Sequence, residues 1–325
     1  MPFSPNNLRI CHGPLQLCLI PPLRLVGQPW SSLPASGFIS LLESTLLMTS
    51  PALQEIIALL GCPAAGNPAQ YLFERAFEAA GLDWRFLTLD VTPDRLADAI
   101  NGAKAMGFRG CLLSGPLRAA ALPMVASSSP AATFSAAVSL IQPEPSGLMG
   151  HMTDGRGAVE ALRAHIDPAN AHVLIIGAGA AARATAVELS LARVAQILVC
   201  DRTPERAASL VASLQALDGA PAAVLQWDAS AEVPPQVGIV IFAVPASGPK
   251  PAVALTGIRS DLVVADFALV TQPSPVVAYA IKHGACAIDG LEIHCEKTAI
   301  DFQTLTGIEP DTDLLREALD EFLNA

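Results

Sequence analysis

The chain has 325 residues, of which 52% are hydrophobic and 15% are charged, and its formal net charge is −11. A single hydrophobic core stops growing near about 250 to 300 residues, so this length predicts two domains. The negative net charge and the lack of a Lys and Arg cluster argue against electrostatic binding to nucleic-acid phosphates or anionic lipid. We therefore expect small-molecule partners, no nucleic acid and no membrane.

The first 47 residues differ in composition from the rest of the chain. They are rich in proline, contain one acidic residue, Glu43, and lack the basic and then apolar layout of a signal peptide. We expect residues 1–47 to be an unstructured or mis-started extension, with a targeting segment as the alternative. The fold is therefore sought from residue 48 onward.

Strand-like and helix-like segments alternate from Ile56 onward. The apolar runs "IIALLG", "WRFLTL" and "GCLLSG" are separated by helical periodicity near residues 69–80 and 92–106. This alternation predicts a parallel sheet covered by helices. Further on, Asp154 in "MTDG" is placed to cap the helix that follows it.

A glycine-rich turn follows the apolar strand 173–176. Gly177, Gly179 and Ala182 occupy the three small positions of a dinucleotide-binding turn, and the next strand, "QILVC", ends at Asp201. Such a turn lets backbone amides approach a diphosphate at the N-terminus of the following helix, and an acid at this spacing binds ribose. The alternative is a glycine turn that serves packing only.

The remaining segments continue the alternation. They are "VGIVIFAVP", "DLVVADFAL", a helix over 275–283, "ACAIDGLEI", and two final helices, the second capped by Asp311 or Asp313. The sequence thus predicts an α/β protein in which an N-terminal α/β domain accompanies a Rossmann-type, doubly wound parallel sheet.

Seven cysteines are scattered along the chain, and no two of them form a Cys-x-x-Cys pair. This pattern predicts neither a disulfide framework nor a zinc site. We therefore expect no metal and a location in the reducing cytoplasm. The sequence carries no specific interface signature, and we expect a monomer or homodimer.

Taken in order, these motifs resemble the shikimate dehydrogenase family. "GFRGCLLSGPLR" stands where the family has Gly-x-Asn-Val-Thr-x-Pro-x-Lys, and "GLMGHMTDG" where it has Gly-Tyr-Asn-Thr-Asp-Gly. "DRTPERA" is similar to its Asn-Arg-Thr clamp for NADP, and "DGLEIHCEKTAIDFQTLTG" to its C-terminal segment. The resemblance implies a substrate domain, 48–152, completed by helices 293–325, a Rossmann domain, 153–292, and hydride transfer between NAD(P) and a ring alcohol or ketone.

The resemblance also implies three catalytic positions, occupied here by Arg118, Asp154 and Lys297. Arg118 replaces a family lysine; a guanidinium stays protonated, so it is a poor general base but a suitable fixed charge beside a developing alkoxide. The alternative is a structural ion pair with Asp154. Lys297 replaces a glutamine and is either a proton donor, an anion-binding group, or a surface lysine on a slipped helix. His151 and His294 flank these positions and are expected to be packed or solvated.

Binding positions follow from the same resemblance. Those for substrate are Asn67, Ser114 and Ser139. Those for the cofactor are Gly177, Ala178, Gly179, Ala180, Ala182, Asp201, Arg202, Thr203, Arg206, Val244 and Gly290. Asp201 favours NAD because it accepts both ribose hydroxyls and repels a 2'-phosphate, whereas Arg202 and Thr203 favour NADP. We expect NAD or NADP, with NAD preferred.

Most of the polar groups that the family directs at its substrate are replaced. Family serines correspond to Asn67 and Ala69, and further polar positions are occupied by Leu112, Met152 and Leu269. Unpaired substrate hydroxyls cost about 1 to 3 kcal/mol each, so we expect an NAD(P)-dependent oxidoreductase for a cyclic hydroxy or keto acid other than shikimate. The alternatives are a catalytically lapsed nucleotide-binding regulatory protein, and a true shikimate or quinate dehydrogenase with a rewired site.

Overall fold

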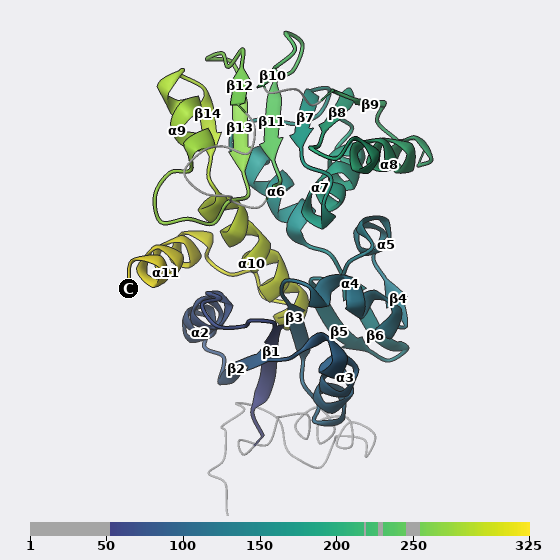
Figure 1. Cartoon of the computed structure of the whole chain (residues 1–325). Coiled ribbons are helices and arrows are strands. Elements are labelled where there is room, and N and C mark those ends of the chain that lie inside the picture. Colours follow the sequence, from purple (N-terminus) through teal and green to yellow (C-terminus); the bar gives the residue numbers. More distant parts are fainter. Residues whose placement is uncertain (1–52, 218, 227–229, 245–253) are drawn as a thin grey trace, which may run out of the picture. The chain divides into compact units, whose positions relative to one another are not determined.

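Two six-stranded sheets organise the chain in the computed structural model, which describes residues 53–217, 219–226, 230–244 and 254–325 (Figure 1). Residues 54–325 form one compact unit. The expected extension, residues 1–47, lies outside the described residues. The predicted fold class, an N-terminal α/β domain with a Rossmann-type domain, is confirmed.

The first sheet has the strand order β2-β1-β3-β5-β6-β4. Its strands are β1 (Glu55–Gly61), β2 (Trp84–Asp90), β3 (Gly110–Leu113), β4 (Ser127–Ser128), β5 (Leu140–Glu144) and β6 (Gly147–His151). β1, β2 and β3 are parallel, but β5 is antiparallel to both β3 and β6. The predicted parallel pairing is confirmed for β1, β2 and β3, but β5 makes the sheet a mixed one. Only Pro145 and Ser146 join β5 to β6, and a connection this short can form a hairpin but not a parallel crossover.

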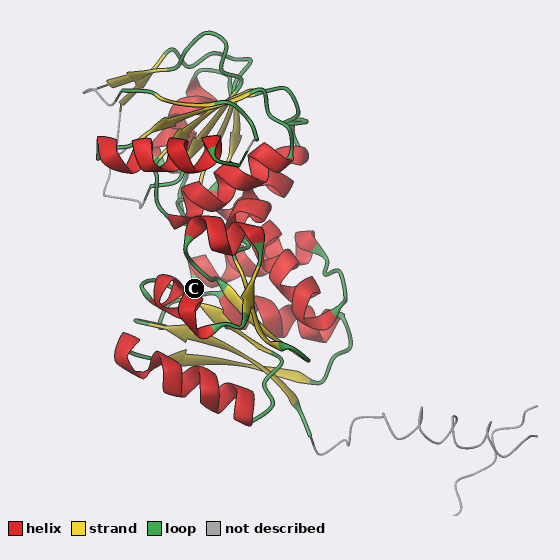
Figure 2. Cartoon of the chain, turned by 90° about the vertical axis from the view of Figure 1, so that its right-hand side faces the viewer, coloured by secondary structure: helices red, strands yellow, loops and turns green. Residues whose placement is uncertain are grey.

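Helices pack against this sheet (Figure 2). They are α2 (Ala69–Ala79), η2 (Pro93–Arg95), α3 (Leu96–Ala105), α4 (Leu117–Ala121), η3 (Leu122–Met124) and α5 (Pro130–Ser135). The two final helices, α10 (Gly290–Thr306) and α11 (Thr312–Asn324), return from the end of the chain and pack on α2. Phe73 and Phe77 of α2 contact Phe302 of α10, so the C-terminus completes this core. Of the two expected caps for α11, Asp311 is the one observed.

The second sheet is parallel throughout, in the order β14-β13-β11-β7-β8-β9. Its strands are β7 (His172–Ile176), β8 (Gln196–Cys200), β9 (Ala222–Val224), β11 (Ile239–Phe242), β13 (Val263–Asp266) and β14 (Cys286–Ile288). Its helices are α6 (Asp154–Arg163), α7 (Ala180–Leu191), α8 (Pro204–Gln215) and α9 (Pro275–Lys282), and β10 (Ser230–Glu232) pairs with β12 (Ala254–Thr256). The chain leaves β7 for β8 on one side and later returns to β11 on the other. The loop after β7 therefore lies at the switch point where such sheets bind ligands.

Helix α6 packs between α7 and α10 at two glycines. A Cβ on Gly155 would lie 2.3 Å from the carbonyl carbon of Ala184, and one on Gly157 would lie 2.8 Å from the backbone nitrogen of Lys297. Only glycine permits both approaches, so α6 and α10 are held close together. Asp154 begins α6, but its carboxylate does not cap the helix as expected, because it pairs with Arg118 instead.

None of the described helices combines the length and the hydropathy that a membrane span requires.

Candidate active site

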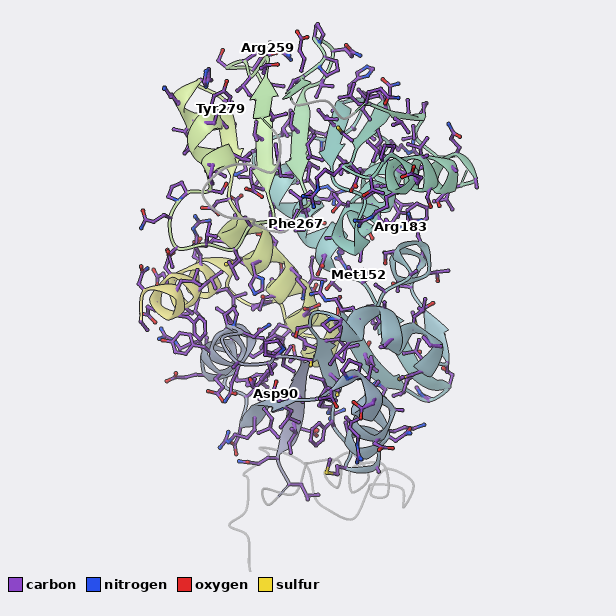
Figure 3. All side chains as sticks on the ribbon, in the orientation of Figure 1. Asp90, Met152, Arg183, Arg259, Phe267 and Tyr279 are labelled. Carbon is purple, nitrogen blue, oxygen red and sulfur yellow. The ribbon has the colours of Figure 1, made fainter. Side chains whose placement is uncertain are left out.

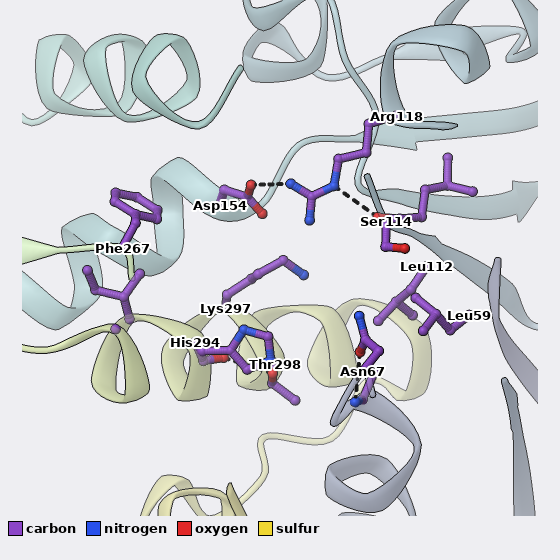
Figure 4. Close-up of a pocket in the computed structure, with 14 residues that line it drawn as sticks. Leu59, Asn67, Leu112, Ser114, Arg118, Asp154, Phe267, His294, Lys297 and Thr298 are labelled. Atoms are coloured by element: carbon purple, nitrogen blue, oxygen red, sulfur yellow. Dashed lines mark hydrogen bonds and ion pairs between the residues drawn. The ribbon is translucent and has the colours of Figure 1, made fainter. Parts of the chain in front are cut away.

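Arg118, Asp154 and Lys297 line one pocket of about 190 Å³, together with Asn67 and His294 (Figure 4). The pocket is smaller than the roughly 300 to 1,000 Å³ typical of drug-sized ligands, so it suits a small metabolite. Phe267, which follows β13, lines it as well and lies beside α10 in Figure 3. The structure thus brings together three side chains that lie up to 179 residues apart (297 − 118) in the sequence.

Arg118 is fixed by two hydrogen bonds. Its Nη1 donates to Oδ2 of Asp154 at 2.5 Å, and its Nε donates to the carbonyl of Leu113 at 2.9 Å. The Asp154 side chain is 8% exposed and that of Arg118 is 26% exposed. A guanidinium held in this way presents a permanent positive charge at the pocket wall.

Asp154 keeps one oxygen available. Burial by itself would raise the pKa of its carboxyl, but the charges of Arg118 and Lys297, with the Arg118 hydrogen bond, hold that pKa below its ordinary value. The carboxylate is therefore ionised at neutral pH. Its Oδ1 is buried and has no hydrogen-bond partner in the described structure. A buried acceptor without a partner is an uncommon feature that a bound hydroxyl would satisfy.

Lys297 projects from α10 into the pocket and is not a surface lysine on a slipped helix. Its side chain is 12% exposed, and its Nζ pairs with Asp301, whose side chain is fully buried. Thr153, the residue before Asp154, donates from Oγ1 to the other oxygen of Asp301 at 2.7 Å. Lys297 is therefore linked through Asp301 to Thr153, the residue next to Asp154 in the sequence.

His294 is a pocket residue that sequence reasoning undervalued. It lies one turn before Lys297 on α10 and lines the pocket, whereas His151 does not belong to the lining. Burial, and then the charge of Lys297, lower the pKa of His294 to about 4, so its imidazole is neutral at neutral pH. Its Nε2 is buried without a partner, like Oδ1 of Asp154. The only sequence signal for this role was the position of His294 three residues before Lys297.

Replacing His294 with glutamine is expected to make the protein less sensitive to acid. The unfolded imidazole titrates near 6.5 and the folded one near 4, so between these values the unfolded chain binds more protons. This contribution to stability is complete above pH 6.5 and is lost as the pH falls, by about 3 kcal/mol at pH 4. Urea unfolding of both proteins at pH 7 and pH 4.5 measures the difference. Equal losses in the two proteins would contradict the prediction.

The expected substrate positions divide into two groups. Asn67 and Ser114 line the pocket, and Oδ1 of Asn67 accepts a hydrogen bond from the amide of Ala69 at 3.0 Å, which leaves its NH₂ group for a ligand. Ser139 is 1% exposed and does not line the pocket; its Oγ accepts from the amide of Thr153 at 3.0 Å. Ser139 thus supports the backbone next to Asp154.

The residues expected at the cofactor, except Gly290, gather around the loop after β7. Gly177 has φ +117°, and a Cβ there would lie 2.6 Å from the carbonyl oxygen of Ala243, so glycine is required. Gly179 precedes α7, and a Cβ on it would come within 3.5 Å of the Arg206 guanidinium. This geometry fits a diphosphate, because the first amides of α7 and a cation converge on an uncrowded loop. Ala178 and Ala180 stand beside these glycines, and Ala182 is fully buried, as close helix packing requires.

Asp201 accepts two backbone hydrogen bonds, one from this loop and one from its own turn. Oδ2 accepts from the amide of Ala178 and Oδ1 from that of Thr203, each at 2.8 Å. Thr203 is the N-cap residue of α8, but its side chain makes no capping hydrogen bond to that helix. Arg202 lies between them and is exposed. Val244 borders Gly177, while Gly290 lines the main pocket at the start of α10.

These two parts, a dinucleotide-type loop and a small polar pocket, define the class of nicotinamide-dependent oxidoreductases with a separate substrate domain. Comparison with known proteins names the family. Residues 59–141 match the shikimate dehydrogenase substrate binding domain, and residues 160–252 match the shikimate / quinate 5-dehydrogenase family. The NADP-dependent shikimate dehydrogenase of Moorella thermoacetica is 32% identical over 83% of this chain and 94% of its own. The chain belongs to the shikimate dehydrogenase family of oxidoreductases.

Solved structures of differently named enzymes have a similar fold. The ligand-free 5-ketofructose reductase of Gluconobacter sp. strain CHM43 is similar with a TM-score of 0.80 and 29% identity, over 83% of this chain and 99% of that one. The shikimate 5-dehydrogenase of Listeria monocytogenes, solved with shikimate and NAD, gives a TM-score of 0.74 and 25% identity over 82% and 96%. The Moorella enzyme is thus named for NADP, and the Listeria enzyme was solved with NAD.

Proposed function

We propose that this protein catalyses NAD(P)-dependent interconversion of a small, uncharged hydroxylated ketone and its alcohol. The observation that carries the proposal is the charge balance of the pocket. Arg118 pairs with Asp154, and Lys297 pairs with Asp301, so the two positive charges are offset by two negative ones. Among the described lining residues, a substrate carboxylate would therefore find no spare cation, and burying it unpaired is costly.

The open polar atoms suit hydroxyl groups. Oδ1 of Asp154 can only accept a hydrogen bond, and Nε2 of the neutral His294 accepts or donates according to its tautomer. The NH₂ group of Asn67 adds a donor. A hydroxylated ketone would satisfy these atoms, whereas a hydrocarbon ring would leave them unpaired at about 1 to 3 kcal/mol each.

Each charged residue has a role in this reaction. The nicotinamide, when bound, supplies or accepts the hydride. Lys297 donates the proton to the carbonyl oxygen and takes it back in the reverse direction, since the guanidinium of Arg118 cannot. Arg118 stabilises negative charge that develops on that oxygen, and Asp154 orients both Arg118 and the substrate. We assign substrate binding to residues 48–152 with 293–325, and cofactor binding to 153–292.

One structural relative supports an uncharged substrate, whereas the curated relatives are named for an acid. The similar 5-ketofructose reductase acts on a keto sugar according to its name, while the curated relatives are shikimate dehydrogenases. The test is a panel in which turnover is followed by the absorbance of the reduced coenzyme. Keto sugars such as 5-ketofructose are given with NADH or NADPH, and shikimate and quinate with NAD or NADP. We expect turnover of the neutral compounds to exceed that of the acids.

Asp154→Asn serves as the active-site variant and Asp261→Asn as its matched control. Asp261 lies at an exposed position before β13, with a side chain 69% exposed, and should not affect turnover. Faster turnover of an acid would replace the proposed substrate with a hydroxy or keto acid. Coenzyme binding without turnover of any compound would favour a nucleotide-binding regulatory protein.

We infer that Asp201 directs the coenzyme preference toward NAD. Its carboxylate lies at the loop expected to meet the ribose, and it would repel a 2'-phosphate. Asp201→Asn is expected to shift the ratio of the two dissociation constants toward NADP by about tenfold. The carboxylate and a nearby 2'-phosphate carry like charges, and their repulsion costs about 1 to 3 kcal/mol. Calorimetric titration with NAD and NADP measures the ratio. A ratio equal to that of the unmodified protein would contradict the inference.

A further inference from the structure

Four polar side chains form a hydrogen-bonded series behind the pocket. Oγ of Ser139 accepts from the amide of Thr153 at 3.0 Å, and the two hydroxyl oxygens are 3.1 Å apart. Oγ1 of Thr153 donates to Oδ1 of Asp301 at 2.7 Å, and Oδ2 of Asp301 accepts from Nζ of Lys297. These hydrogen bonds therefore link the first sheet, the start of α6 and α10 to one amine in the pocket.

Asp301 is the residue in this series that needs an explanation. Its side chain is fully buried and does not line the pocket, so it does not meet a ligand. A buried ion pair contributes little to stability compared with apolar residues of the same volume, because both charges lose their hydration. Stability is thus a poor reason for an acid at this position.

The geometry restricts the amine of Lys297. Lysine has a flexible stem of four carbons, and its ammonium group is a compact charge that many conformations can accommodate. Asp301 lies one turn further along α10 and accepts the amine with one oxygen, while Thr153 holds the other oxygen. The carboxylate is therefore fixed from two sides and in turn fixes the amine.

We propose that Asp301 is a positioning residue that holds the amine of Lys297 at the substrate oxygen for proton transfer. The proposal rests on the proposed function. In the reductive direction, a bound reduced coenzyme would supply a hydride to the carbonyl carbon as the C=O π bond opens, and would itself be oxidised. An O–H bond forms at the carbonyl oxygen as an N–H bond of Lys297 breaks. Lys297 then regains a proton from solvent through its partly exposed side chain.

A double-mutant cycle tests this role with Asp301→Asn and Lys297→Gln. Asp301→Asn keeps the volume of the side chain and an acceptor for Thr153 but removes the charge that holds the amine. We expect it to lower kcat by about 10-fold to 100-fold with KM changed less than about threefold, as for a displaced catalytic group. In the Lys297→Gln background, the same change should lower kcat by less than about twofold, because there is no amine left to position.

A purely structural role predicts a different result, namely equal losses of kcat in both backgrounds or a change confined to thermal stability. Either outcome would overturn the proposal, as would an unchanged kcat in Asp301→Asn. If Asp301→Asn does not fold, Thr153→Val carries the test. It removes the second hydrogen bond to Asp301, and it should lower kcat in the presence of Lys297 and not in Lys297→Gln.

The controls separate this proposal from the proposed function. Absence of turnover in the unmodified protein, or full activity in Lys297→Gln, would reject the proposed function or the role of Lys297. Loss of activity in Lys297→Gln with full activity in Asp301→Asn would reject only the role of Asp301.

Discussion

Lys297→Met is expected to lower kcat by about 10²-fold to 10⁴-fold, the range typical for removal of a general acid or base. The pocket offers no simple substitute, since Arg118 stays protonated and His294 is neutral at neutral pH. Methionine keeps the length and the apolar stem of the side chain, so the pocket should keep its shape. Steady-state kinetics with the best substrate of the panel, in both directions, measures the effect.

Lys282→Met is the matched control for this prediction. Lys282 ends α9 at an exposed position and belongs neither to the pocket nor to any ion pair in the described part of the chain. Its replacement should leave kcat within about twofold of the unmodified value, as for most surface substitutions. If Lys297→Met kept the full kcat while binding coenzyme normally, the proton would have to come from elsewhere, and the proposed mechanism would fail.

The parallel sheet could be predicted from the sequence because its strands are buried on both faces. Residues 173–176 and 239–242 are continuous apolar runs, and both became fully buried strands. The glycine turn was recognisable for a related reason, since Gly177 meets a steric demand that only glycine satisfies. Patterns of this kind involve residues close together along the chain, so they can be recognised in the sequence alone.

The direction of β5 and the contacts between site residues were harder to predict from the sequence. A two-residue connection such as Pro145-Ser146 reverses the chain, but the apolar runs beside it look alike in a parallel or an antiparallel sheet. Ser139 was expected to meet substrate and instead supports Thr153, which depends on how residues 139 and 153 meet in space. The Thr153 to Asp301 contact spans 148 residues, and no local pattern predicts it.

His294 shows where the resemblance to a family also reaches its limit. His294 lies three residues before Lys297, and residues at this spacing lie on the same face of a helix, so the spacing made His294 a neighbour of the site. Its depressed pKa arises from burial and from Lys297, and both effects exist only in the folded chain. The sequence therefore supplied the candidate, while its chemical state required the structure.

Gly157→Ala is expected to reduce both stability and activity, because Gly157 is where α6 contacts α10. The added Cβ would lie 2.8 Å from the backbone nitrogen and the Cβ of Lys297, so α10 must move away. Overpacking of this kind costs about 1 to 3 kcal/mol, and the displaced helix carries Lys297 with it. A shift of about 1 Å at a catalytic group can cost about 10²-fold in rate. We therefore expect a lower Tm and a kcat reduced well beyond what a partly unfolded fraction would explain.

Gly102→Ala provides the control for Gly157→Ala, because Gly102 lies within α3 and a new Cβ there would come no closer than 3.9 Å to Cε of Met106. Alanine is favoured over glycine inside a helix by about 0.5 to 1 kcal/mol, so this variant should be slightly more stable and fully active. Thermal unfolding and steady-state kinetics on the same samples compare the two variants. If Gly157→Ala behaved like Gly102→Ala, the close contact of α6 with α10 would not be what places Lys297, and the amine would have to be held by Asp301 alone.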